Sequence, residues 1–418
     1  MEQIYITKLS IQKVRHLKNI TIPLSEGHIK HLILTGKNGS GKTSVVEALA
    51  EYLNQAVTNV FFDDMEAWLS EAQMSRDEAL QNGAEESEII RLEKDVSDRE
   101  ANLARTRRGL SVQFNQSTKS LLALKEKYHY VLACYRADRI FEATQPRHVE
   151  KVELKDDYLL SDFPRTDFIK YLLDLKMTEA LARNNQKIKK ADEIQGWFKK
   201  LEDLLKKVFD DETVALIFDE DTFQFHISQQ GKELFDFNTL SSGYQAVLDI
   251  ILDIMMRMEK KTQRTFDFKL PGIVLIDEIE THLHLELQKN IMPLLTGLFP
   301  NIQFIVTSHS PFILNSLENA VIYDLENNVL VENGLGNVPY DGIVEGYFST
   351  DKLSGILKEK FMQYKNLVGK DSISDDELSE IAELELYLDE IPDYLALGIS
   401  TEYQRLKLEF MNREDIDG

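Results

Sequence analysis

The stretch that decides the fold is Gly36-Lys37-Asn38-Gly39-Ser40-Gly41-Lys42-Thr43. It follows an apolar run at residues 32–34 and precedes residues 44–49, whose composition predicts a helix. The stretch matches the phosphate-binding pattern GxxxxGK[ST], in which glycines let consecutive backbone N–H groups face a polyphosphate. The alternative is a glycine-rich turn with an exposed lysine. Because an apolar strand comes before the pattern and a helix after it, we expect a nucleoside triphosphate site.

The residues of this loop have separate expected roles. Lys42 reaches the β- and γ-phosphates, and the Thr43 hydroxyl binds Mg²⁺. Backbone N–H groups at the start of the following helix favour bound anions. The loop residues predicted to bind the nucleoside triphosphate are Gly36, Asn38, Gly39, Ser40, Gly41, Lys42 and Thr43.

The composition is that of a folded globular protein. Of the 418 residues, 43% are apolar and 28% are charged, which argues against wholesale disorder. The length suits two or three domains of about 150 residues each. Cys134 is the single cysteine, so no intramolecular disulfide is expected. Because the chain starts without a secretory signal and no apolar run approaches the roughly 20 residues that span a bilayer, we expect a cytoplasmic protein without membrane contact.

The charge is unevenly distributed. The net charge of −23 disfavours nucleic acid at first sight, but residues 371–418 contain 15 acidic and 3 basic residues and so account for −12 of it. The net charge therefore neither supports nor excludes a local DNA-binding surface, which depends on clustering. The acidic tail itself is either a solvated helical face or a docking site for a basic partner.

Strand patterns surround the phosphate loop and return later. Short alternating runs predict three strands within residues 3–35. Residues 130–135 predict another strand, and residues 214–227 predict a hairpin. Two wholly apolar runs, at residues 273–276 and 304–306, are typical of strands buried on both faces of a parallel sheet. The pattern predicts an α/β fold.

The segment from residue 63 to residue 127 has helical composition almost throughout. Ile89, Val96, Leu103 and Leu110 recur every seven residues, which indicates a weak coiled-coil seam. We expect a helical hairpin that turns near Asn82, with a later helix of about 40 residues that is roughly 60 Å long.

Two carboxylates end the apolar run at residues 271–276. In a nucleotide-binding sheet the first acid can hold Mg²⁺, directly or through water, and the second can accept a proton from an attacking water. We assign Asp277 to the metal and Glu278 to the general base. An acidic pair at the end of a strand can also be a helix cap, but its place downstream of a phosphate loop favours catalysis.

Two further motifs lie downstream of the phosphate loop. Leu240-Ser241-Ser242-Gly243-Tyr244-Gln245 precedes an apolar helix at residues 246–258, with Ser241 as the predicted N-cap and the helix start as an anion site. Thr307-Ser308-His309-Ser310-Pro311 follows another strand. The chain thus has a phosphate loop, a long insertion, Leu-Ser-x-Gly, a strand ending in Asp-Glu, and a histidine.

With this order the chain resembles the ABC-type ATPase heads of the SMC, RecF and overcoming-lysogenization-defect branch, over residues 1–60 and 130–325. The segment at residues 240–245 is similar to their signature motif. His309 is similar to the switch histidine that senses the γ-phosphate, and a buried, hydrogen-bonded histidine is the alternative. The resemblance implies that ATP is bound between two heads, the loop of one facing Ser241 and Gly243 of the other.

The resemblance also implies a domain organisation. The expected fold is a P-loop ATPase head with a mixed β-sheet and flanking helices, formed by residues 1–62 and 130–336. Residues 63–129 form a helical hairpin or short coiled-coil insertion, and residues 337–418 an acidic helical region. Arg15 lies where related heads place a phosphate-proximal arginine, and an ordinary solvated arginine is the alternative.

The spacing of the motifs along the chain narrows the range of possible functions. About 197 residues separate Thr43 from Ser241, far more than in transporter heads, and the last 80 or so are helical, unlike a Toprim nuclease. The chain is most similar to the free-standing ATPase subunits of Septu-type bacterial antiphage systems, which act with a separate HNH nuclease. The resemblance implies a homo-oligomer that regulates such a partner, with ATP and Mg²⁺ as cofactors and with slow hydrolysis or nucleotide occupancy acting as a switch.

The alternative function is a DNA-binding repair or recombination ATPase. It would need a basic stripe on the head, and the insertion contains several basic residues that could form one or could be an ordinary solvated helix surface. These residues are Arg99, Arg105, Arg107, Arg108, Lys119, Lys125 and Lys127.

Overall fold

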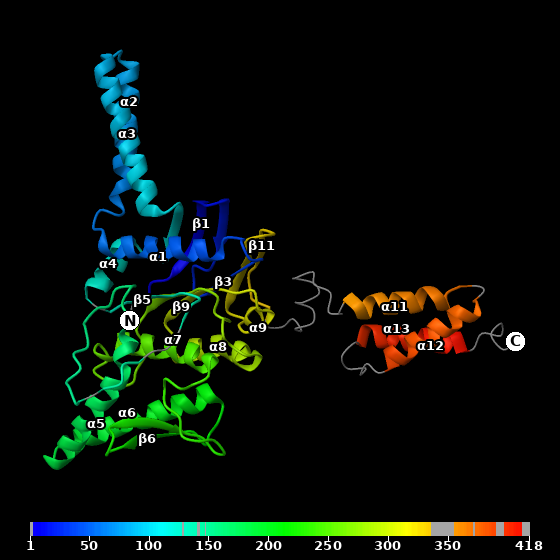
Figure 1. Cartoon of the computed structure of the whole chain (residues 1–418). Helices are drawn as coiled ribbons and strands as arrows, with labels where there is room; N and C mark the ends of the chain where they lie inside the picture. Colours follow the sequence, from blue (N-terminus) through cyan, green and yellow to red (C-terminus); the bar gives the residue numbers. More distant parts are fainter. Residues whose placement is uncertain are drawn as a thin grey trace. The chain divides into compact units, whose positions relative to one another are not determined.

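A computed structural model of the chain (Figure 1) describes residues 3–127, 129–139, 143–146, 148–335, 355–370, 373–389 and 397–411. The chain divides into two compact units, Met1–Val338 and Pro339–Gly418. The first unit contains the β-sheets and the phosphate loop.

A six-stranded sheet forms the centre of the first unit. Its order is β11-β10-β3-β9-β8-β5, and all neighbouring pairs are parallel except β10 and β11. Every residue of β3, β8 and β9 is buried, as the wholly apolar runs predicted. The strands are β3 (His31–Thr35), β5 (Val131–Tyr135), β8 (Gly272–Ile276), β9 (Ile302–Thr307), β10 (Ala320–Asp324) and β11 (Val329–Val331).

A second sheet has three antiparallel strands in the order β2-β1-β4. The strands are β1 (Ile6–Val14), β2 (Leu17–Pro23) and β4 (Leu110–Phe114). Between the two sheets lies α1 (Lys42–Thr58), which contacts β8 and β9 on one side and β1 and β4 on the other. Its buried residues Val45, Val46, Leu49 and Leu53 recur at helical spacing, so α1 joins the sheets into one core.

The opposite face of the six-stranded sheet is covered by α7 (Ser242–Glu259) and α8 (Leu285–Leu298). Figure 1 shows α1 on one side of the strands and α7 and α8 on the other. Since residues 246–259 are all buried, α7 is a central helix. The remaining elements of this unit are α4 (Thr118–Glu126), η1 (Pro164–Asp167), α5 (Phe168–Asn184), α6 (Ile188–Phe209), β6 (Ala215–Asp219), β7 (Gln224–Ser228) and α9 (Pro311–Leu314). The expected hairpin at residues 214–227 is confirmed as the antiparallel pair β6 and β7.

The helical insertion is shorter than the sequence predicted. The hairpin consists of α2 (Asp64–Gln81) and α3 (Glu86–Arg107), which pack on each other and extend away from the sheets in Figure 1. The expected helix of about 40 residues is wrong: the chain turns at Arg108, which has a left-handed φ of 54°. From Leu110 to Phe114 buried residues alternate along β4, which pairs with β1. Leu110 therefore belongs to a strand and not to the seven-residue seam.

The second unit is helical where it is described. It contains α11 (Gly355–Val368), α12 (Asp375–Asp389) and α13 (Leu397–Met411). These helices have their own core, to which Phe361, Tyr364, Ile381, Leu384 and Tyr403 contribute. Residues 336–354 lie outside the described part of the chain. Among the described helices of both units, none has the length and apolar character needed to cross a membrane.

Candidate nucleotide site

The phosphate loop connects β3 to α1. Gly36, Gly39 and Gly41 all have positive φ, and α1 begins directly at Lys42. At Gly41 the φ is 99°, and a Cβ atom would come within 2.8 Å of Leu17 Cδ1. The left-handed backbone favours glycine at this position, because a residue with a side chain would be strained there. Leu17, the first residue of β2, therefore lies against the loop at Gly41.

Two side chains of the loop, those of Lys42 and Ser40, have buried hydrogen-bond donors. Lys42 is buried, and its Nζ donates to the carbonyl oxygens of Gly36 at 2.6 Å and Lys37 at 3.2 Å. The Ser40 hydroxyl is buried and has no hydrogen-bond partner among the described residues. An ammonium group has three donors, so Lys42 retains one beyond these two bonds.

The acidic pair follows β8 and is held by Thr307 at the end of β9. The Thr307 hydroxyl donates to Asp277 Oδ1 at 2.6 Å and accepts the backbone N–H of Glu278 at 2.7 Å. Glu278 has a left-handed φ of 45°, which is unusual for a residue other than glycine. Its carboxylate accepts a hydrogen bond from the Thr281 hydroxyl at 3.2 Å. A single threonine thus orients both acids.

A cleft of about 760 Å³ lies between the acids and Thr43, the last residue of the loop, whereas residues 36–42 and His309 do not line it. Thr43, Asp277, Glu278 and Arg15 line it together, as do Lys13, Glu47, Arg108, Cys134 and Asp138. Burial raises the pKa of the Cys134 thiol to about 11, so a neutral thiol faces the cleft. The two residues expected to bind Mg²⁺, Thr43 and Asp277, therefore line the same cleft as the expected general base Glu278. Arg15 lines this cleft too.

His309 lies just beyond β9 and is held by Glu280. Its Nδ1 pairs with Glu280 Oε1 at 2.8 Å, and the same oxygen accepts the His309 backbone N–H at 2.8 Å. Glu280 is 7% exposed, whereas the histidine side chain is 56% exposed. The alternative of a buried histidine is therefore wrong: the ring is half-exposed and anchored at one nitrogen.

Ser241 and Gly243 lie elsewhere on the same head. Ser241 occupies the N-cap position of α7, as the sequence predicted, but its exposed side chain makes no capping hydrogen bond. Gly243 is buried against the segment that follows the acids: a Cβ atom there would lie 3.0 Å from the His282 carbonyl oxygen. Neither residue lines the cleft that contains Thr43 and Glu278.

Three residues of the site were not singled out in the sequence: Thr307, Glu280 and Arg139. Thr307 and Glu280 lie within or beside motifs that the sequence did identify, next to His309 and Glu278. Arg139 follows β5 and donates to the carbonyl oxygens of Asp277 at 2.7 Å and Glu278 at 3.0 Å. Nothing in the local sequence marks Arg139, because its partners are 138 and 139 residues away.

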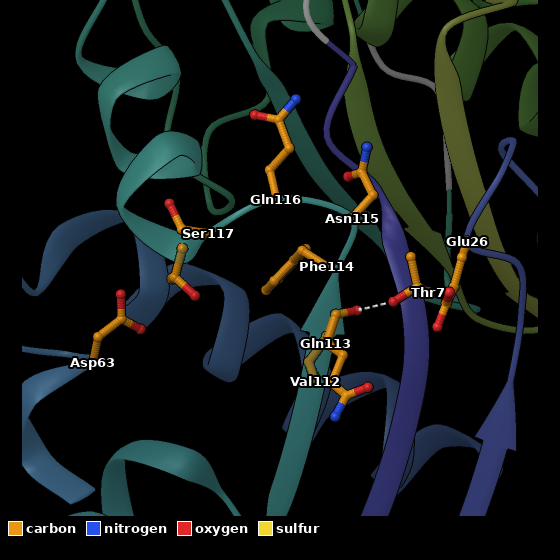
Figure 2. A pocket seen from close by; sticks show the side chains of 10 residues that line it. Thr7, Glu26, Asp63, Val112, Gln113, Phe114, Asn115, Gln116 and Ser117 are labelled. Atoms are coloured by element: carbon orange, nitrogen blue, oxygen red, sulfur yellow. Dashed lines mark hydrogen bonds between the residues drawn. The ribbon is translucent and has the colours of Figure 1, made fainter. Parts of the chain in front are cut away.

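A separate pocket of about 650 Å³ lies beside β4 and the start of α4. Figure 2 shows its lining, which includes Glu26, Asp63, Asn115 and Ser117, and the hydrogen bond that the Thr7 hydroxyl donates to the Gln113 carbonyl oxygen at 3.2 Å. No residue of the phosphate loop or the acidic pair lines this pocket. It is distinct from the nucleotide cleft.

The basic residues of the insertion are largely engaged within the protein. Five of the seven have partners: Asp95 for Arg99, Glu51 for Arg108, Asp64 for Lys119, Asp157 for Lys125, and the Tyr52 hydroxyl and Phe62 carbonyl for Arg107. Lys125 is also buried. These five do not form an unpaired basic stripe.

Two family models match the chain. A model described as an AAA domain, with the names AbiEii toxin and Type IV TA system, matches residues 136–315. A KAP family P-loop domain matches residues 21–220. The first unit thus has an α/β fold with a phosphate loop and flanking helices, and it is similar in sequence to these two domain models.

Two curated proteins are similar in sequence. Septu protein PtuA of Bacillus mycoides (strain KBAB4) is 27% identical over 422 residues, which cover 97% of this chain and 53% of that protein. The Retron Ec83 probable ATPase of Escherichia coli is 36% identical over 138 residues, which cover 31% of this chain and 25% of that protein. The chain thus spans about half the length of the first relative and a quarter of the second.

Among solved structures, an SMC head bound to the C-winged helix domain of ScpA matches with a TM-score of 0.38 and 15% identity. The match covers 80% of this chain and 98% of that one.

Proposed function

We propose that this chain, which resembles Septu protein PtuA over 97% of its length, binds and hydrolyses ATP and associates head to head with a second copy. In that state it regulates a separate nuclease in bacterial antiphage defence. The observation that carries the proposal is the placement of Thr43, Asp277 and Glu278 around one cleft, with Ser241 and Gly243 outside it.

The phosphate loop fits a polyphosphate. The third donor of the Lys42 ammonium and the unpartnered, buried Ser40 hydroxyl are available to phosphate oxygens. Gly36, Asn38, Gly39 and Gly41 would contribute backbone N–H groups, which form an anion-binding concavity in such loops. We therefore assign the phosphates of ATP to this loop.

The cleft also fits Mg²⁺, which prefers oxygen ligands. The Thr43 hydroxyl and the Asp277 carboxylate would hold the ion. When bound, Mg²⁺ neutralises charge on the phosphates during phosphoryl transfer. Because Thr307 occupies Asp277 Oδ1 as a donor, the carboxylate is fixed in direction and keeps lone pairs for a cation.

Glu278 is the proposed general base, and His309 the proposed γ-phosphate sensor. Glu278 lines the cleft next to Thr43 and is less than fully buried, so its carboxylate can accept a proton from a water aligned with the phosphate. The half-exposed His309 ring is anchored through Nδ1 by Glu280, which leaves Nε2 for the phosphate.

Head-to-head association is supported by the position of Ser241 and Gly243, which do not line the cleft of their own head. Ser241 and Gly243 stand at the N-terminus of an 18-residue helix, and the exposed Ser241 side chain makes no cap bond. A helix start with free N–H groups and a free hydroxyl favours an anion. Since these groups lie outside the cleft of their own head, the ATP of a second copy would complete them.

The test uses two variants. Lys42→Ala should abolish ATP binding, because it removes the phosphate-facing ammonium. Glu278→Gln should keep ATP binding, remove hydrolysis, and trap paired heads with ATP and Mg²⁺. Calorimetry gives the affinity, and light scattering gives the mass. If Glu278→Gln stays monomeric at saturating ATP and Mg²⁺, head-to-head association is contradicted.

The nuclease partner is supported by the similarity to Septu protein PtuA. An HNH nuclease encoded beside this chain, co-expressed with it, should co-purify with the wild type, and its release or activity should change with ATP. Loss of co-purification in every nucleotide state would contradict this part. Direct DNA binding is less favoured, because five of the seven basic residues considered for it are engaged within the protein.

A further inference from the structure

Arg139 makes an unusual set of contacts behind the acidic pair. It is 5% exposed and follows β5 in the chain. Its two terminal nitrogens donate to four carbonyl oxygens: Arg136 at 2.8 Å, Asp277 at 2.7 Å, Glu278 at 3.0 Å and Ile279 at 3.3 Å. Three of the four belong to consecutive residues. A planar guanidinium with five donors can make such a set, and a lysine ammonium cannot.

The three consecutive carbonyls belong to the turn that directs the proposed general base. Glu278 has a left-handed φ of 45°, a conformation that costs energy for a residue with a side chain. Thr307 holds the N–H of this residue, and Arg139 holds its carbonyl. The backbone of Glu278 is therefore fixed on both sides, and its carboxylate direction depends on that fixation.

Arg139 also borders a cavity that α7 lines. Asp249 of α7 is fully buried and forms an ion pair with Arg165. Arg139, Arg165 and Asp249 line a common cavity of about 650 Å³. No hydrogen bond or ion pair joins Arg139 to Asp249 among the described residues, and burial raises the pKa of Asp249 to about 7. The contacts of Arg139 are therefore those with the carbonyl oxygens of the acidic turn.

We propose that Arg139 is a positioning residue for hydrolysis, which fixes the Glu278 turn by donating hydrogen bonds to the carbonyl oxygens of that turn. The inference rests on the proposed function.

The test compares Arg139→Lys with a matched control, Arg107→Lys. Arg107 is also largely buried and also donates to a backbone carbonyl, that of Phe62, but it does not line the cleft. Single-turnover hydrolysis, ATP affinity and thermal midpoint are measured for the wild type and both variants. We expect Arg139→Lys to lower the hydrolysis rate at least tenfold and to leave the ATP dissociation constant within twofold. Arg107→Lys should lower only the thermal midpoint.

A wild-type rate for Arg139→Lys, or a loss of rate matched by losses of ATP affinity and folded protein, overturns the inference. Glu278→Gln tests the proposed function separately: if it hydrolyses ATP like the wild type, the general base is wrong whatever Arg139 does.

Discussion

The two acids of the cleft share one hydroxyl. Thr307 donates to Asp277 and accepts from the N–H of Glu278, so one side chain orients the proposed metal ligand and the proposed base. Because Thr307 is fully buried, no water replaces it. A buried donor or acceptor left without a partner costs about 1–3 kcal/mol.

Thr307→Val should therefore lower both the stability and the hydrolysis rate, although valine and threonine have nearly the same shape. It leaves the Glu278 N–H and Asp277 Oδ1 without this partner, so we expect the free energy of unfolding to fall by about 2 kcal/mol and hydrolysis to slow more than tenfold. Thr307→Ser keeps the hydroxyl and should recover most of the rate. Urea unfolding and single-turnover hydrolysis measure the two effects. Equal rates for the valine and serine variants would contradict the orienting role.

Glu280 offers a second test at this scale, because it anchors His309 through one oxygen. Glu280→Ala should free the ring and lower the hydrolysis rate about tenfold, equivalent to roughly 1.4 kcal/mol in the barrier, with little change in ATP affinity. His309→Ala should lower the hydrolysis rate by a similar factor. The variant with both substitutions should be no slower than either single variant. If the two losses multiply, Glu280 does not act through His309.

The sequence predicted the residues of the site that stand in contiguous motifs. The loop at residues 36–43 and the pair Asp277 and Glu278 are recognisable because their spacing is local. Thr307, Glu280 and Arg139 are not, since their roles depend on hydrogen bonds to residues 29 to 140 positions away. Only the parallel order of β5, β8 and β9 brings these side chains together.

At the scale of elements, the wholly apolar strands and the hairpin of β6 and β7 were predictable from composition and alternation. The end of α3 was not. Leu110 continues the seven-residue repeat of Ile89, Val96 and Leu103, and it also begins an alternating strand pattern. The pairing of β4 with β1 decides that Leu110 is in a strand and not in a helix. This pairing is a tertiary contact, so it cannot be recognised from the local repeat of apolar residues.

Arg107 attaches the α2–α3 hairpin to the head. Its guanidinium donates to the Tyr52 hydroxyl at 2.7 Å and the Phe62 carbonyl at 3.1 Å, and it lies 3.9 Å from the centre of the Phe62 ring. Arg107→Ala should lower the free energy of unfolding by about 2 kcal/mol and should speed hydrogen exchange in α2 and α3. ATP affinity should stay unchanged. Unchanged exchange in both helices would contradict this attachment.

The central strands carry a pH-dependent contact. His31 of β3 is buried, and its Nδ1 accepts the backbone N–H of Phe304 at 3.1 Å. Burial lowers its pKa to about 4, below the usual 6.5. The unfolded chain therefore binds a proton between these values while the folded chain does not, so the free energy of unfolding falls as the pH drops from about 6.5 to about 4.

The contribution of His31 over this range is up to about 3 kcal/mol. His31→Asn keeps an acceptor for the Phe304 N–H and does not titrate. The difference in unfolding free energy between the wild type and this variant should therefore change across the window and stay flat above pH 7. Urea unfolding at several pH values measures it, and a constant difference from pH 7 to pH 4 would contradict the assignment.

At the scale of the whole molecule, the two units have separate cores. The head core is built from both sheets and α1, while the second unit has its own cluster around Tyr364 and Tyr403. The composition predicted helices for the second unit, and the described part contains three. Each unit should therefore unfold as its own cooperative transition.

Removal of the second unit should leave ATP binding intact. A chain ending at Val338 keeps the loop, the acidic pair and every residue that lines the cleft. We expect the same ATP dissociation constant within twofold, and calorimetry should show one unfolding transition fewer than the full chain. A large loss of ATP affinity would mean that the second unit supports the cleft.

The contact between Gly243 and the carbonyl of His282 constrains how this protein can vary. The start of α7 and the segment after the acids are fitted to each other so closely that a side chain at position 243 would push both apart. A substitution in either segment is therefore tolerated only when the other segment can accommodate it. We expect the two segments to be inherited as a matched set, and chimeras that exchange one without the other to assemble poorly.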